Sequence, residues 1–225
     1  MNLTLKNITE YFLLKDKKVR KFFIIFYCIG ALGIAIPPTR NIFIYLTPIA
    51  LLISFITVIL FHQSTFDTKS ILIFAIICLI GFLIEAAGVR TGFLFGEYTY
   101  GKGLGIKVLE TPLLIGINWL LLVYCTSVIA ERLPVLNIMK ILASSLLMVF
   151  YDLFMEQVAP HIQMWTFKGG IVPLRNYISW FIIAFLLNSL LKLAGVKIIN
   201  KLAPLIFYCQ LVFFIVLYIF FTIVE

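Results

Sequence analysis

Charged residues are scarce in this 225-residue sequence, at 12%, while hydrophobic residues make up 63%. A soluble domain usually has about one quarter charged residues and about one half apolar residues. The composition therefore excludes an ordinary soluble protein and predicts an integral membrane protein. The net charge of +8 does not indicate nucleic-acid binding, because the excess Lys and Arg lies beside apolar segments, where such residues contact membrane lipids.

Histidine and aspartate are also rare, with only His62, His161, Asp16, Asp67 and Asp152 in the chain. Membrane di-iron hydroxylases and desaturases need several histidine clusters, and prenyltransferases need paired aspartate-rich motifs, so both classes are excluded. No metal site is predicted. The cysteines form no CxxC motif, and each lies in an apolar run, as expected for small buried side chains: Cys28, Cys78, Cys125 and Cys209.

Long apolar runs are the dominant feature of the sequence. Most of them approach the ~20 residues that a membrane-spanning helix needs. We therefore predict an all-α, polytopic membrane helical bundle of about seven transmembrane helices, forming a single integral membrane domain over residues 1–225. The predicted segments are 22–36, 41–61, 71–88, 112–130, 138–159, 174–191 and 203–223.

Lys and Arg are unevenly divided between the two ends of these segments. With the N-terminus inside, twelve of them fall on the cytoplasmic side and six outside. Because cytoplasmic loops carry the excess of Lys and Arg, we predict a cytoplasmic N-terminus in a bacterial inner (plasma) membrane. In either orientation, the loops at about 89–111 and 160–173 emerge on the same face.

The stretch "YDLFMEQVAP", residues 151–160, places Asp152 and Glu156 one helical turn apart on one face. Acids inside membrane segments are costly and commonly functional. Two so close together in apolar surroundings are expected to share at least one proton. A third acid, Glu85, ends its segment in "FLIEAAGVRTG". Either Glu85 pairs structurally with the nearby Arg90, or it has a catalytic role.

Two further patterns lie in the loops on this face. The segment "RTGFLFGEYTYGKGLG", residues 90–105, is rich in glycine and aromatic residues, which suits an apolar ligand or an interfacial loop. It lacks the Gly-Lys-Ser/Thr ending of a phosphate loop. The stretches "TPLLIGINW" and "VPLRNYISW" both place a tryptophan seven residues after a proline, at Trp119 and Trp180.

Several blocks occur in order: "EAAGVRTGFLFGEYTYG", "PLLIGINW" and "DLFMEQVAP…W…GGIVPLRNYISWF". Over about residues 81–182, the chain resembles the membrane carotenoid biosynthesis proteins that include carotenoid 1,2-hydratases and bisanhydrobacterioruberin hydratase. The resemblance implies a carotenoid hydratase, a cofactor-independent hydro-lyase. It would add water across a terminal C=C bond of an acyclic carotenoid to give a tertiary alcohol. The implied partners are the carotenoid in the bilayer, membrane lipids and other carotenoid biosynthesis enzymes, with no nucleic acid.

Alkene hydration needs a positioned acid, stabilisation of a tertiary cation and one water, but no redox cofactor or metal. The predicted catalytic residues are therefore Asp152, Glu156 and Glu85. The predicted substrate-binding residues come from the same face of the bundle: Arg90, Phe93, Phe95, Glu97, Tyr98, Asn118, Trp119, His161, Trp165, Arg175, Asn176 and Trp180.

Two non-enzymatic alternatives use the same residues. A transporter could employ the acids as a proton relay. A carotenoid-binding scaffold subunit could hold pigment without altering it. Pigment analysis separates these readings, since only an enzyme adds the mass of one water.

Overall fold

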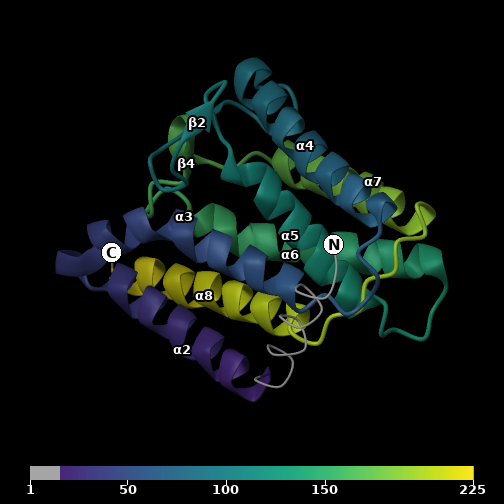
Figure 1. Ribbon diagram of the computed structural model, residues 1–225. Helices are drawn as coiled ribbons and strands as arrows, with labels where there is room; N and C mark the ends of the chain where they lie inside the picture. Colours follow the sequence, from purple (N-terminus) through teal and green to yellow (C-terminus); the bar gives the residue numbers. More distant parts are fainter. Residues whose placement is uncertain (1–15, 225) are drawn as a thin grey trace.

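A computed structural model of the protein describes residues 16–224 (Figure 1). This part of the chain is a bundle of seven α-helices with short strands in two loops. The predicted all-α class is confirmed, and each helix overlaps one of the predicted segments. The helices are α2 (Asp16–Ala35), α3 (Pro37–Leu60), α4 (Thr68–Thr91), α5 (Leu114–Ala130), α6 (Asn137–Val158), α7 (Leu174–Leu193) and α8 (Ala203–Val224).

Five of these helices, α3, α4, α6, α7 and α8, are long and apolar enough to cross a membrane. A helix can span a bilayer because it satisfies its own backbone hydrogen bonds. These helices make the chain an integral membrane protein. Helix α5 has 17 residues and is shorter, but it is buried along nearly its whole length. That α2 and α5 also cross the bilayer stays a prediction.

Local sequence explains where several helices begin and end. Helix α3 starts with Pro37 and Pro38, whose missing N–H groups need no partner in a first turn. Asp67 caps α4 by accepting a hydrogen bond of 2.8 Å from the Ser70 backbone N–H. Gly92 ends α4 in the left-handed conformation, with φ of 62°.

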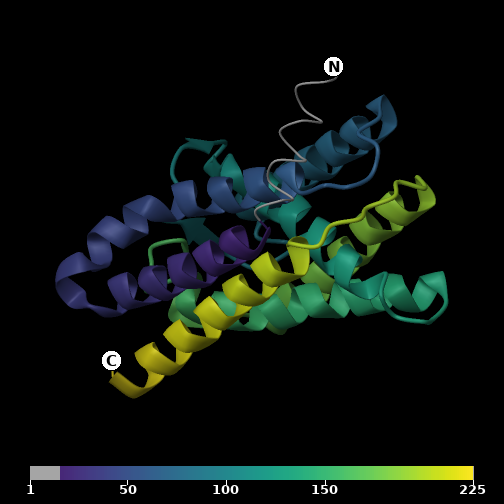
Figure 2. The ribbon, with the colours of Figure 1, turned by 60° about the horizontal axis from the view of Figure 1, so that its bottom comes forward.

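Helix α5 lies at the centre of the bundle, in contact with α3, α4, α6, α7 and α8. Helices α2 and α3 form a hairpin, and α8 packs beside α2, as Figures 1 and 2 both show. Helices α4 and α5 approach closely, because a Cβ on Gly81 would lie only 2.6 Å from the Trp119 Cβ. Small residues allow such close packing in membrane bundles. Here the close packing brings the end of α4 against α5.

Two loops carry the sequence motifs, one between α4 and α5 and one between α6 and α7. These motif loops meet at one end of the bundle. Strand β1 (Tyr98–Tyr100) pairs antiparallel with β4 (Trp165–Phe167), with Tyr98 opposite Phe167 and Tyr100 opposite Trp165. A second small hairpin joins β2 (Lys107–Val108) to β3 (Thr111–Pro112), and the 3₁₀ turn η1 (Lys168–Gly170) follows β4. The prediction that these loops share a face is therefore confirmed.

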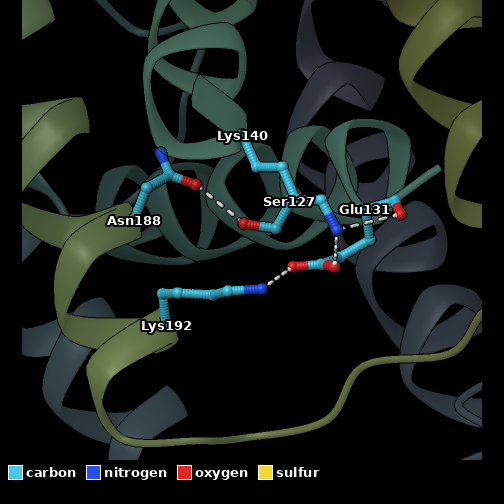
Figure 3. A network of polar contacts seen from close by, with 5 residues as sticks. All are labelled: Ser127, Glu131, Lys140, Asn188 and Lys192. Carbon is cyan, nitrogen blue, oxygen red and sulfur yellow. Dashed lines mark hydrogen bonds and ion pairs between the residues drawn. The ribbon is translucent and has the colours of Figure 1, made fainter. Parts of the chain in front are cut away.

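At the opposite end, polar contacts join the ends of α5, α6 and α7, as Figure 3 shows. Lys140 bonds Glu131 at 2.9 Å, and Lys192 also pairs with Glu131. The Ser127 hydroxyl donates to Asn188 at 2.7 Å, which links α5 to α7. Which end faces the cytoplasm stays a prediction, and two of the residues that it counted, Lys6 and Lys15, lie outside the described residues.

Candidate functional site

The three predicted acids lie in the bundle interior, next to the β1–β4 ribbon. Asp152 is 0% exposed, Glu156 3% and Glu85 4%. Glu85 comes from α4 and Glu156 from α6, and both line one small cavity of about 10 Å³, the acid cavity. This volume is about the minimum needed to hold a single water molecule. The other lining residues are mainly aromatic: Phe95, Tyr98, Tyr100, Ile115, Trp165, Phe167, Asn176 and Trp180.

Glu85 is held by three donors. The hydroxyl groups of Tyr98 and Tyr100 donate to its Oε2 at 2.6 and 2.9 Å, and the Trp119 indole N–H donates to Oε1 at 3.0 Å. Burial raises the pKa of both phenols, and the Glu85 charge raises it further. Both tyrosines therefore keep their protons and remain donors. Glu85 does not pair with Arg90, which lies on the exposed surface.

Asp152 and Glu156 are joined by the side-chain amide of Asn176. Its Nδ2 donates to Asp152 Oδ2 at 3.1 Å and to Glu156 Oε1 at 2.9 Å. The other Glu156 oxygen, Oε2, accepts from the Trp165 indole at 2.7 Å. Asp152 Oδ1 is buried and has no hydrogen-bond partner among the described residues. It is the only oxygen of the three acids without a donor.

The local sequence explains how these partners reach the acids. In β1 and β4, alternate residues point to opposite faces, so the motifs "YTY" and "WTF" each bury two aromatic rings and expose a threonine. Asn176 lies in the first turn of α7, three residues after Pro173. Because α7 packs along α6, this turn lies beside the last turns of α6.

Two tryptophans close the site between α5 and α7. The rings of Trp119 and Trp180 stack with centroids 4.1 Å apart and an interplanar angle of 24°. These are the two tryptophans that follow a proline at the same spacing. Stacked rings present broad π surfaces, which can stabilise a cation nearby.

The structure brings most of the predicted site residues together and leaves five outside. Asn118 is buried and lines a second, larger cavity, but not the acid cavity. Phe93 is 78% exposed, and Glu97 makes a surface ion pair of 2.5 Å with Lys168. Arg90, His161 and Arg175 are also exposed; the imidazole of His161 stacks on Phe221 of α8. None of these five lines the acid cavity, because their side chains project outward from loops or helix ends.

Sequence reasoning missed three residues that line the cavity. Tyr100 was considered only as part of the aromatic loop, and Phe167 and Ile115 were not singled out. The alternation in "YTY" and "WTF" was the available signal for the first two, since period two predicts a common face. Nothing distinguishes Ile115 from the other apolar residues of its helix.

The acid cavity is made entirely from the part of the chain that carries the ordered motifs. The family model described as "Carotenoid biosynthesis protein" matches residues 46–225. The chain belongs to this family. The match extends beyond the motif blocks to include most of α3 and all of α8. No curated protein and no solved structure matches the chain significantly.

Proposed function

We propose that this carotenoid biosynthesis protein is a hydratase that adds water across a terminal C=C bond of an acyclic carotenoid, giving a tertiary alcohol. One observation carries the proposal. Two buried carboxyl groups from different helices face a cavity of about 10 Å³, the size of one water, surrounded by aromatic rings. Alkene hydration requires this set of components: an acid, one water and a polarisable wall.

The proton is assigned to Asp152. Two neighbouring buried carboxyl groups cannot both be charged without a large electrostatic cost. Both oxygens of Glu156, and Oδ2 of Asp152, already accept hydrogen bonds from groups that can only donate. Each of those oxygens already has one lone pair engaged by a donor, and such a hydrogen bond favours the unprotonated oxygen. Asp152 Oδ1 has no such donor, so it is the position at which the pair holds its proton.

The reaction then proceeds in two steps. The Asp152–Glu156 pair transfers its proton, through Glu156 at the cavity wall, to the less substituted carbon of the terminal double bond, whose π electrons form the new C–H bond. This step leaves a tertiary cation and an Asp152 carboxylate. Water adds its oxygen to the cation, and its proton passes through the Glu156–Asp152 pair, which regenerates the acid. The sum is alkene plus water giving alcohol, with no change in the enzyme.

Glu85 and the aromatic rings stabilise the cation. Glu85 accepts from three donors, which favour its ionised form against the effect of burial, and in this proposal it supplies the negative charge that faces the cation across the cavity. A preorganised charge in a site of low polarity is effective because it does not need to reorient during the reaction. The ring of Trp180 lines the same cavity and adds a cation–π contribution.

Expression in a lycopene-accumulating host tests the proposal. The extracted pigment should gain the mass of one water per reacting end, and the added oxygen should carry label from H₂¹⁸O. Label from ¹⁸O₂ would contradict hydration. Pigment that co-purifies unaltered would favour a carotenoid-binding scaffold, while pigment that is neither altered nor bound would favour a transporter.

A further inference from the structure

A second cavity lies against the acid site and is open to the lipid-facing surface. It has a volume of about 200 Å³ and is enclosed by α2, α3, α5, α6 and α8. Ile115 lines both this cavity and the acid cavity. At its outer end, the cavity is lined by Ile29, Leu46 and Ile49, which are 53%, 43% and 52% exposed on the lipid-facing surface. The cavity therefore connects the bilayer side of α2 and α3 with the wall of the acid site.

The lining is almost entirely apolar and rich in flat rings. Its aromatic members come from four helices: Phe26, Tyr27, Phe43, Tyr151, Phe213 and Phe214. Tyr151 and Met155 lie on α6 beside Asp152 and Glu156. Such a lining suits a rigid conjugated hydrocarbon, because aromatic faces pack well on a planar polyene.

Hydrogen bonds between three helices set the geometry of this cavity. The Tyr27 hydroxyl lies 2.7 Å from the Ser54 hydroxyl and accepts from Gln210 Nε2 at 3.0 Å. These contacts join α2, α3 and α8 within the apolar interior. Two of these side chains, Tyr27 and Gln210, line the cavity, and none of the three lines the acid cavity.

We propose that this cavity binds one end of the linear polyene, which enters sideways from the bilayer between α2 and α3 while the remainder of the molecule stays in lipid. The inference rests on the proposed function for the identity of the ligand. The volume supports partial insertion. A cavity of about 150 Å³ accommodates benzene, so 200 Å³ holds an end segment of a carotenoid and not the whole chain. Its inner end places the terminal double bond at Ile115, beside the water-sized cavity.

Two substitutions fill the cavity from different helices. Gly30→Leu adds a side chain on α2, where a Cβ would lie 3.6 Å from Phe213, an ordinary contact. Leucine also favours a helix over glycine, so α2 should still form. Ala50→Phe adds a ring on α3. The matched control is Ala75→Phe on α4, where the alanine is exposed to lipid and lines neither cavity.

Each variant is purified from lycopene-accumulating membranes, and the carotenoid bound per protein is measured by absorbance and mass spectrometry. Wild type and Ala75→Phe should retain equal amounts, whereas Gly30→Leu and Ala50→Phe should retain about tenfold less or lower, a loss of about 1.4 kcal/mol. Their elution as single peaks in gel filtration checks folding. Equal retention by all four proteins would overturn the inference, as would cavity variants that lose phospholipid but keep lycopene.

The outcomes separate this inference from the proposed function. If wild type retains lycopene in a cavity-dependent manner without hydrating it, the binding site stands and the hydratase assignment fails. If all variants hydrate and retain lycopene equally, the hydratase assignment stands and the polyene lies elsewhere.

Discussion

The amide variants Glu156→Gln and Asp152→Asn should behave differently in folding, although each removes one carboxyl group. The two Glu156 oxygens accept from the Trp165 indole and the Asn176 amide, at 2.7 and 2.9 Å. In Glu156→Gln, one oxygen becomes an NH₂ that must face one of these donors. The indole can only donate, and turning the Asn176 amide would remove the donor from Asp152.

The magnitude follows from that conflict. A buried donor left without an acceptor costs about 1–3 kcal/mol, and for a chain of this length each kcal/mol corresponds to about 2–4 °C in Tm. Glu156→Gln should therefore melt about 2–12 °C below wild type. Asp152→Asn can keep its oxygen toward Asn176 and place the NH₂ at the Oδ1 position, where no donor opposes it and where the proposed wild-type acid already holds an unpartnered O–H. Its Tm should therefore fall less than that of Glu156→Gln.

Both variants should lose hydration, because general acid–base catalysis contributes about 10²–10⁴-fold. Melting is followed by fluorescence-detected gel filtration in detergent, and hydration by the mass of the extracted pigment. An Asp152→Asn protein that folds normally but makes no product would support the acid assignment directly. Wild-type hydration by this variant would refute it, and equal Tm values for the two variants would refute the hydrogen-bond arrangement.

Three other perturbations test separate parts of the structure. Glu85→Gln should fold, because the Tyr98 and Tyr100 hydroxyls can turn to accept from the new amide, but hydration should fall by about 10²–10³-fold; an unchanged rate would make Glu85 a structural residue. Gly81→Leu should lower the yield of folded protein in gel filtration, because a Cβ there lies 2.6 Å from the Trp119 Cβ, whereas Ala75→Leu on the lipid-facing side of the same helix should not. Glu97→Gln should leave hydration unchanged. Hydrogen bonding and charge from Lys168 hold the pKa of Glu97 below its ordinary value of 4.5. Any stabilisation by the Glu97–Lys168 pair is therefore fully present above pH 4.5 and is lost as the pH falls through the lowered pKa. The Tm values of wild type and Glu97→Gln should then converge in acid.

The sequence alone determined the membrane character, the helix positions and the principal acids. Hydropathy is a local property, because each segment of about 20 apolar residues can satisfy its own backbone and favour lipid independently of the others. The spacing of Asp152 and Glu156 likewise follows from the periodicity of one helix. Even the meeting of the two motif loops could be predicted, since an up-and-down chain returns every second connection to the same face.

Only the tertiary structure decided which side chains surround those acids. The pairing of β1 with β4 brings Trp165 to Glu156 and Tyr100 to Glu85, and the packing of α7 on α6 lets Asn176 bridge two carboxyl groups. In the folded chain Phe93 and Glu97 are exposed, whereas Phe95 and Tyr98 of the same loop are buried. These outcomes depend on how residues far apart in the chain pack against one another, and no local pattern encodes that packing.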